Sequence, residues 1–185
     1  MDVAMLERAV ESTGRVVAGV SQDDLDRPTR CTEWSVRDLL NHLIGSYEAV
    51  AAAAGAGVTN SPATDFTASD HAAAYHGAAA KAVKALAAAG ALDRTFEMAW
   101  GATPGHMVLG LTIADTVVHG DDLAHATGQG SPVEPDLAEA VYGMTTNMME
   151  PQGSFPRGSA FGPPVEVPDD APIQDRMLAY LGRRP

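Results

Sequence analysis

The sequence predicts an all-α protein, a four-helix bundle with a short C-terminal helix and one short extended segment. Three observations lead to this prediction. Four long stretches place apolar residues three and four positions apart, the spacing of an amphipathic helix. Each stretch follows a residue that can cap a helix, and the stretches between them are rich in loop-forming residues. With 185 residues, 45% of them apolar, the chain can bury one core, so a single domain over residues 1–185 is expected.

The first two helices are expected at Val3–Val20 and Val36–Ala54. Asp2 can cap the first helix. Ser35 and Asp38 have the spacing of a capping box at the start of the second helix. The polar stretch between the helices contains a proline and is expected to be a loop. The apolar stripe of the second helix is formed by Val36, Leu39, Leu40, Leu43, Tyr47 and Val50.

The third helix is expected at Asp70–Ala89, after a surface loop at 54–68 rich in Gly, Ser, Thr and Pro. Its sequence is rich in alanine, and Gly90 is expected to close it. Residues 92–100 show a partial two-residue alternation of large apolar side chains. This alternation predicts a short strand or an extended crossover packed on the bundle.

The fourth helix is expected at Pro104–Thr127, with Thr103 as its cap and proline at its first position. A fifth helix is expected from Pro135 to Glu150. The stretch 151–168 has too many glycine and proline residues for a helix and is expected to be irregular. A short last helix is expected over about 170–181.

Composition and charge narrow the classes of function. The single cysteine, Cys31, excludes an intramolecular disulfide and a cysteine-rich zinc ribbon. The net charge of −12 argues against nucleic-acid binding, which requires clustered Lys and Arg. The sequence contains neither a signal-peptide pattern nor an apolar run of about 18 residues that could span a bilayer. These features predict a cytoplasmic protein with no membrane partner.

A candidate metal site emerges from three residues on two predicted helices. Asp115 precedes His119 by four residues, so both side chains lie on one helix face. His42 borders the apolar stripe of the second helix and should point inward. Two imidazoles and one carboxylate suit Zn²⁺ and leave a coordination position for water or substrate. The same donors also suit Ni²⁺ or Fe²⁺.

Other interpretations of these residues stay open. A histidine in the middle of a helix can be a hydrogen-bonded core residue, and an Asp-x-x-x-His pair can be solvated or structural. Asp122, three residues after His119, can accept the other imidazole proton of that histidine or face solvent. Trp34 can wall the site or anchor the packing. Cys31 is expected to be structural or incidental, and the remaining histidines are not expected to form a joint site.

Two stretches carry a resemblance to a known family: CTEWSVRDLLNHLIG at 31–45 and DTVVHGDDLAHATG at 115–128, supported by the C-terminal 25 residues. They resemble actinobacterial metal-binding proteins related to the N-terminal domain of mycothiol-dependent maleylpyruvate isomerase, in the DinB/YfiT-like superfamily. The resemblance implies a DinB-like four-helix bundle. It also implies a divalent ion held by His42, Asp115 and His119.

The chain departs from the resembling family at three positions. The isomerase typically has Glu where this chain has Asp115, which is one methylene shorter. Relatives often read HGWDLARATG, whereas this chain has Asp121 in place of Trp and His125 in place of Arg. If these two residues line the pocket, substrate preference is expected to differ.

The resemblance implies a mycothiol-dependent thiol transferase or isomerase that uses the ion as a Lewis acid. Zinc is the expected ion and nickel the alternative, with mycothiol as the thiol cosubstrate of a small-molecule reaction. The residues leave three other functions open. These are a non-catalytic metal-binding or interaction module, a metal-hydroxide hydrolase, and a bundle whose site has decayed into hydrogen bonds. A homodimer is compatible with all of them, because such bundles commonly dimerise.

Overall fold

The computed structural model describes residues 1–55, 64–149 and 161–185. The chain divides into two compact units, residues 1–132 and 133–185, and each is described here by itself. The helices of the first unit are α1 (Val3–Ala18), α2 (Val36–Ala53), α3 (His71–Ala87) and α4 (Gly105–Thr127), with short 3₁₀ turns at Gln22–Asp24 and Phe66–Ala68. The second unit contains α5 (Pro135–Met149) and α6 (Ile173–Tyr180). The all-α class is confirmed, while the prediction of one domain stays a prediction.

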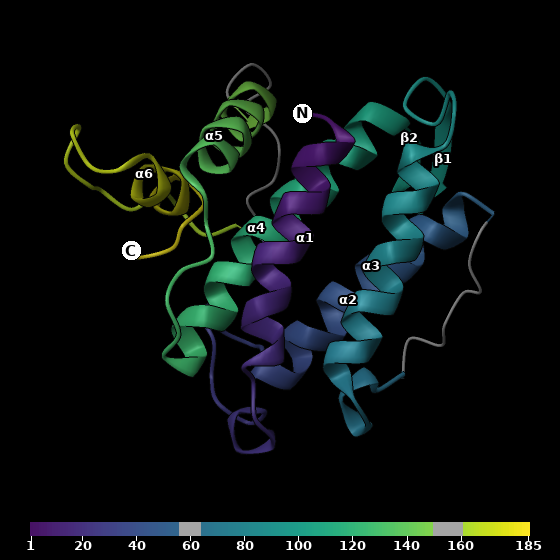
Figure 1. The fold of residues 1–185 in the computed structure, drawn as a ribbon. Helices are drawn as coiled ribbons and strands as arrows, with labels where there is room; N and C mark the ends of the chain where they lie inside the picture. The colour runs from purple at the N-terminus through teal and green to yellow at the C-terminus, as the bar shows by residue number, and fades with distance from the viewer. Residues whose placement is uncertain (56–63, 150–160) are drawn as a thin grey trace. The chain divides into compact units, whose positions relative to one another are not determined.

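The four helices of the first unit form a bundle (Figure 1). Helix α1 packs against α3 and α4, and α2 packs against the same two helices. Each helix therefore has two neighbours, which confirms the predicted four-helix bundle. Its apolar faces are fully buried. The largest buried side chains include Leu6, Leu39, Leu43, Ile44, Leu86, Leu109 and Ile113.

The start of α2 fixes where His42 lies on the bundle. The Ser35 hydroxyl accepts a hydrogen bond from the Asp38 amide, and the Asp38 carboxylate accepts one from the Ser35 amide at 2.9 Å. These two bonds form the predicted capping box, which satisfies amides that the first turn leaves open. The bonds from Ser35 also hold the pKa of Asp38 below its usual value. A fixed helix start determines which residues face inward two turns later.

The link between α3 and α4 differs from the prediction. Helix α3 ends at Ala87, two residues before the expected Ala89. A hairpin of β1 (Thr95–Met98) and β2 (Gly101–Pro104) follows, in place of a single extended segment. The alternation in β1 holds, because its second and fourth residues are buried. Trp100, expected to continue that pattern, is 65% exposed.

The fourth helix also begins differently from the prediction. Thr103 belongs to β2, and its hydroxyl donates to the Gly101 carbonyl instead of capping α4. The first amides of α4 are satisfied by backbone carbonyls: Gly105 donates to Arg94 and His106 donates to Leu92. Gly105 permits this contact, because a Cβ there would lie 2.1 Å from the Ala91 carbonyl oxygen.

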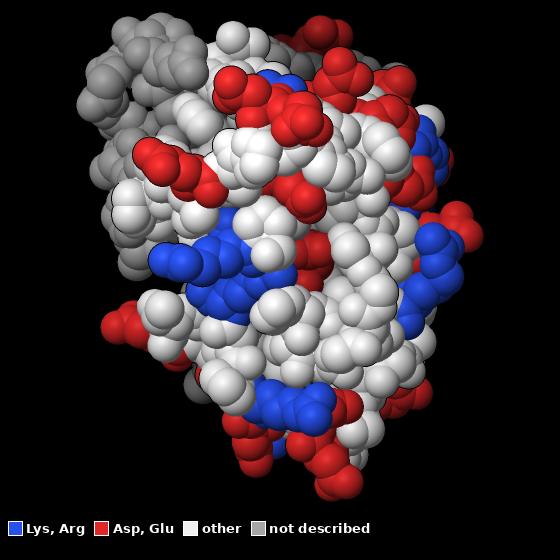
Figure 2. Space-filling view, turned by 90° about the vertical axis from the view of Figure 1, so that its left-hand side faces the viewer, with Lys and Arg blue, Asp and Glu red and all other residues white. Residues whose placement is uncertain are grey.

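In the second unit, α5 and α6 pack against each other, and the Arg176 guanidinium lies over the Tyr142 ring at 5.5 Å. Of the predicted irregular stretch 151–168, residues 151–160 lie outside the described residues. Residues 161–168 contain neither helix nor strand. The face drawn in Figure 2 carries several groups of acidic side chains and separate groups of Lys and Arg. Among the described residues, no helix combines the length and apolarity needed to cross a bilayer.

A buried network of hydroxyl groups joins α2, α3 and α4. The Tyr47 hydroxyl lies 2.7 Å from the Thr116 hydroxyl and 3.2 Å from that of Tyr75. Thr116 donates to the Thr112 carbonyl, and Tyr75 lies within bonding distance of the Val10 carbonyl. Burial raises the pKa of both tyrosines far above the usual value, so both stay neutral.

Candidate metal centre

The three predicted ligands meet between α2 and α4. His42 Nε2 lies 3.0 Å from Asp115 Oδ1, and His119 Nε2 lies 3.4 Å from the same oxygen. All three donor atoms lie within 4.8 Å of one another. The side chains keep partial access to solvent: they are 33% exposed for His42, 26% for Asp115 and 12% for His119. A small molecule can therefore approach this cluster, which is called the first cluster below.

The donor spacing fits a tetrahedral ion. With metal–ligand distances near 2.0–2.2 Å, two nitrogen or oxygen donors of a tetrahedral site lie about 3.4 Å apart. The two measured separations, 3.0 and 3.4 Å, are close to that value. Two neutral imidazoles and one carboxylate are also a donor set that zinc uses in sites with an open position.

The hydrogen bonds of His119 create an electrostatic conflict that a cation removes. Nδ1 of His119 lies 3.0 Å from Oδ2 of Asp122, whose side chain is fully buried. An ionised carboxylate only accepts hydrogen bonds, so Nδ1 carries the imidazole proton. In a neutral ring Nε2 then carries the lone pair and lies 3.4 Å from the Asp115 carboxylate oxygen, so two acceptors lie close together. A proton or a metal ion on Nε2 relieves this repulsion.

The protonation of the other two side chains follows from their contact. Burial by itself lowers the pKa of the His42 imidazole, but the hydrogen bond and the negative charge of Asp115 outweigh burial and raise the pKa. Burial by itself raises the pKa of Asp115, but hydrogen bonding by His42 and the charges of His119 and His42 lower the pKa. The Asp115 carboxylate is therefore ionised over the physiological pH range.

A loop before α2 closes one side of the first cluster. The Trp34 ring centroid lies 4.7 Å from that of His42 and 5.9 Å from that of His119. This packing against both imidazoles is compatible with either of the two predicted roles of Trp34, wall of the site or packing anchor. Cys31 Sγ lies 3.5 Å from Asp122 Oδ2 and 3.9 Å from His119 Nδ1. The sequence predicted a structural or incidental Cys31 and did not identify this contact.

The two unusual residues on α4 hold this loop in place. Asp121 Oδ2 accepts a hydrogen bond from the Arg30 guanidinium at 2.6 Å, and the Ser131 hydroxyl bonds to its other oxygen. The second guanidinium nitrogen of Arg30 lies 2.8 Å from His125 Nδ1. Asp121 is 6% exposed and Arg30 is 15% exposed, so the ion pair is shielded from water. Asp121 and His125 therefore contact Arg30 and lie outside the first cluster.

Helix α1 supports the other side of α4 at the level of His119. A Cβ on Gly120 would lie 2.3 Å from Thr13 Oγ1, so only glycine allows this approach. The Thr13 hydroxyl uses the short distance to donate to the Thr116 carbonyl at 3.1 Å. The residue after His119 is thus fixed against a second helix, which limits movement of the imidazole.

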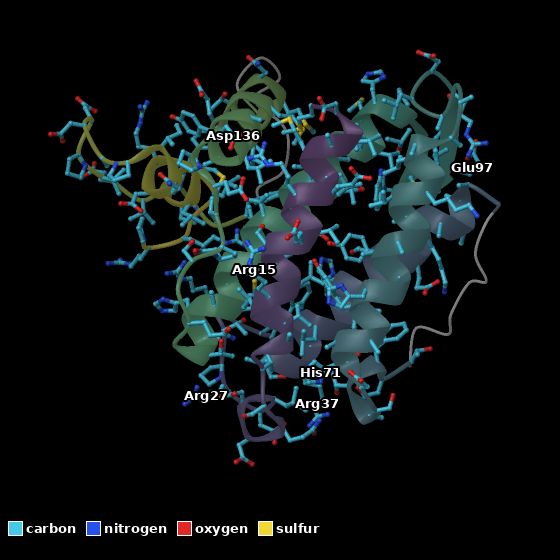
Figure 3. The ribbon with its side chains drawn as sticks, viewed as in Figure 1. Arg15, Arg27, Arg37, His71, Glu97 and Asp136 are labelled. Carbon is cyan, nitrogen blue, oxygen red and sulfur yellow. The ribbon has the colours of Figure 1, made fainter. Side chains whose placement is uncertain are left out.

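The other histidines lie elsewhere. Across the described residues, the groups of three potential ligands are the first cluster and a second one made of Cys31, His119 and Asp122. His71, His76, His106 and His125 belong to neither group. His71 is buried at the start of α3, toward the same end of the bundle as Arg37 (Figure 3). Its Nδ1 has no hydrogen-bond partner among the described residues.

Comparison with known proteins places this bundle in a family. Residues 6–124 match the family described as the mycothiol maleylpyruvate isomerase N-terminal domain, and the chain belongs to that family. Two similar curated proteins, both from Mycobacterium tuberculosis and both uncharacterised, are 33% identical over 177 residues. That alignment covers 96% of this chain and 94% of each relative. No solved structure matches the chain significantly.

Proposed function

We propose that the protein binds one divalent ion, zinc in the first instance and nickel as the alternative, through His42, Asp115 and His119. We further propose that it acts as a mycothiol-dependent thiol transferase or isomerase on a small molecule. The bound ion supplies Lewis acidity, which favours the thiolate form of a thiol substrate. The proposal puts the protein in the cytoplasm, where low-molecular-weight thiols stay reduced.

The main support for the metal site is the lone pair on Nε2 of His119. The buried Asp122 holds the proton on Nδ1, so Nε2 faces Asp115 and His42 with a lone pair. Carboxylate partners of this kind fix the tautomer and orientation of metal-binding histidines. With a carboxylate near each ring nitrogen, Nε2 favours a cation, and a divalent ion is the cation that we propose. The family to which the chain belongs supports the thiol part of the proposal.

The surrounding residues have separate tasks in this proposal. Asp115 supplies negative charge to the ion and stays ionised because its pKa is lowered. Trp34 covers the two imidazole rings and limits the water that reaches them. The partial exposure of His42 and Asp115 leaves the approach through which a substrate enters.

Metal analysis of the full chain, purified without a histidine tag, tests the first part. The wild type is expected to hold about one zinc or nickel ion per chain, and the His42→Ala, His119→Ala double variant essentially none. Equal metal content in the two proteins contradicts the proposed site. A circular dichroism spectrum of the double variant checks that its helices are intact.

Calorimetric titration with mycothiol tests the second part. The zinc-loaded wild type is expected to release or absorb heat on binding the thiol, and the metal-free double variant is not. The absence of a heat signal, together with no competition by mycothiol for the metal, overturns the thiol assignment. Zinc binding without thiol binding instead favours a non-catalytic metal-binding module or a metal-hydroxide hydrolase.

A further inference from the structure

We propose that Cys31, His119 and Asp122 form a second cation site, which prefers thiophilic ions softer than zinc, such as Cd²⁺. This site uses the opposite nitrogen of the His119 ring from the first cluster. It does not rest on the proposed function, because Cys31 and Asp122 belong only to the second cluster. Thiolate donors select soft ions over hard ones, and imidazole and carboxylate complete a common zinc ligand set.

The distances within the second cluster fit a tetrahedral thiolate site. Around a tetrahedral zinc ion, a sulfur donor lies about 3.6 Å from a nitrogen or oxygen donor, and nitrogen lies about 3.4 Å from oxygen. Sγ of Cys31 lies 3.5 Å from Asp122 Oδ2 and 3.9 Å from His119 Nδ1. The nitrogen and oxygen donors lie 3.0 Å apart. All three separations are within 0.4 Å of the expected values, so the donors need little rearrangement.

The loop that carries Cys31 is fixed on both sides of the sulfur. The preceding residue, Arg30, forms the shielded ion pair with Asp121 on α4. The Cys31 amide donates to the Thr29 hydroxyl, and its carbonyl accepts from the Trp34 amide at 2.7 Å. Binding an ion therefore costs little ordering of the loop, which favours affinity. Asp121 and His125 therefore help to position the proposed metal ligand Cys31, because both contact Arg30, the residue before it.

The single proton of a neutral His119 ring links the two clusters. When Nε2 coordinates an ion in the first cluster, Nδ1 keeps the proton and donates it to Asp122. When Nδ1 coordinates an ion in the second cluster, Nε2 carries the proton and donates it to Asp115. Coordination there also displaces the thiol proton of Cys31 to solvent. One ring thus serves one cluster at a time, and the softness of the ion determines which cluster is filled.

Cadmium titration of the full chain separates the two clusters. Cd²⁺ bound to a thiolate gives an ultraviolet charge-transfer band that His and Asp ligands alone do not give. The band is expected to reach its full height at one Cd²⁺ per chain in the wild type. It is also expected in Asp115→Asn, which keeps the shape of the side chain but weakens the first cluster. The titration uses a phosphine reductant, so that no added thiol competes for the ion.

Two further variants complete the test. Cys31→Ser is expected to lose the band while retaining zinc in the first cluster, and His119→Ala is expected to weaken Cd²⁺ binding at Cys31 at least tenfold. The proposal is overturned if wild type and Asp115→Asn show no band at equimolar Cd²⁺. It is also overturned if His119→Ala shows the band with unchanged affinity, because Cys31 then binds without the cluster. Zinc binding by Cys31→Ser tests the first cluster separately, so failures of the two proposals are distinguishable.

Discussion

Two polar clusters that involve helices α2 and α4 differ in burial and in charge. The hydroxyl network of Tyr47, Tyr75 and Thr116 is fully buried and neutral, and its groups find their partners within the protein. The first cluster is next to it along α4, since Asp115 precedes Thr116. It is partly exposed and charged, and one of its lone pairs faces a carboxylate.

The difference distinguishes a polar cluster that stabilises the fold from one that we propose to be prepared for a ligand. Buried polar groups are normally hydrogen-bonded, and a closed network strengthens a unique packing. A cluster that requires an added cation contributes its full interaction energy only when the cation arrives. A change in one cluster should therefore leave the property of the other intact.

Replacing His119 is expected to have the largest effect on metal binding, because this ring belongs to both three-donor clusters. His119→Ala should weaken zinc binding by more than the roughly 100-fold seen when outer hydrogen-bond partners of a site are removed. Competition with a chromophoric chelator measures the affinity. The matched control is His106→Ala, an exposed histidine at the start of the same helix, which should bind zinc as the wild type does. Equal losses in both variants contradict the assignment.

Neutralising Asp122 is expected to weaken zinc binding about 10- to 100-fold, because this carboxylate orients His119 through Nδ1. The measurement is made in the Cys31→Ser chain, in which the first cluster alone offers three donors. Asp122→Asn keeps the side-chain shape. The control is Glu48→Gln, which neutralises another buried acid of the bundle, paired with Lys81 at 2.7 Å. An unchanged affinity in Asp122→Asn shows that Asp122 does not act through His119.

Acidification is expected to weaken zinc binding in the same Cys31→Ser chain. His42 must be neutral to bind an ion, and its pKa is raised above the usual value, so protons compete from a higher pH than for an ordinary histidine. Below that pKa the affinity should fall about tenfold per pH unit. Asp115 stays ionised over this window, because its pKa is lowered.

The stability of the metal-free protein should show the opposite pH trend. A raised pKa in the folded state makes the His42–Asp115 pair stabilising below the unfolded pKa of histidine, and this stabilisation is lost as pH rises through the folded pKa. The gap in Tm between zinc-loaded and metal-free protein should therefore widen as pH rises. Thermal melts at pH values on both sides of the usual histidine pKa measure this difference in Tm. A difference that stays constant with pH contradicts the prediction.

Much of the bundle could be predicted from sequence, because helix periodicity and capping are local signals. The capping box of Ser35 and Asp38 was found in this way. The hairpin was predicted only in part, because β2 contains Thr103 and Pro104, which are also typical of a helix start. Distant backbone carbonyls of residues 92 and 94 cap α4 instead, and no local pattern encodes them.

The candidate site, like the fold, could be predicted only in part. His42, Asp115 and His119 could be selected because each lies on a predicted helix face, and the resemblance supported the same three. Cys31 and Arg30 were missed, because a loop has no periodicity and their partners lie about 90 residues away. One signal was available: Asp121 stands where relatives often have Trp, and an acid at a position that can hold a large apolar side chain requires a cation nearby.

The smallest expected effect tests the hydroxyl network and leaves the first cluster intact. Tyr47→Phe removes the hydroxyl group that bonds to the Thr116 hydroxyl. Thr116 donates its own hydroxyl proton to the Thr112 carbonyl, so Tyr47 is the donor in the bond between the two side chains. The loss of its two buried hydrogen bonds, to Thr116 and Tyr75, should lower the free energy of unfolding by about 1 to 2 kcal/mol, measured by urea denaturation. Zinc affinity should stay unchanged, because His42 and Asp115 keep their contact. Tyr142→Phe, outside this network, is the control and should change stability less. A loss of zinc affinity in Tyr47→Phe would show that the two clusters act as one unit, so that α2 and α4 transmit strain between them.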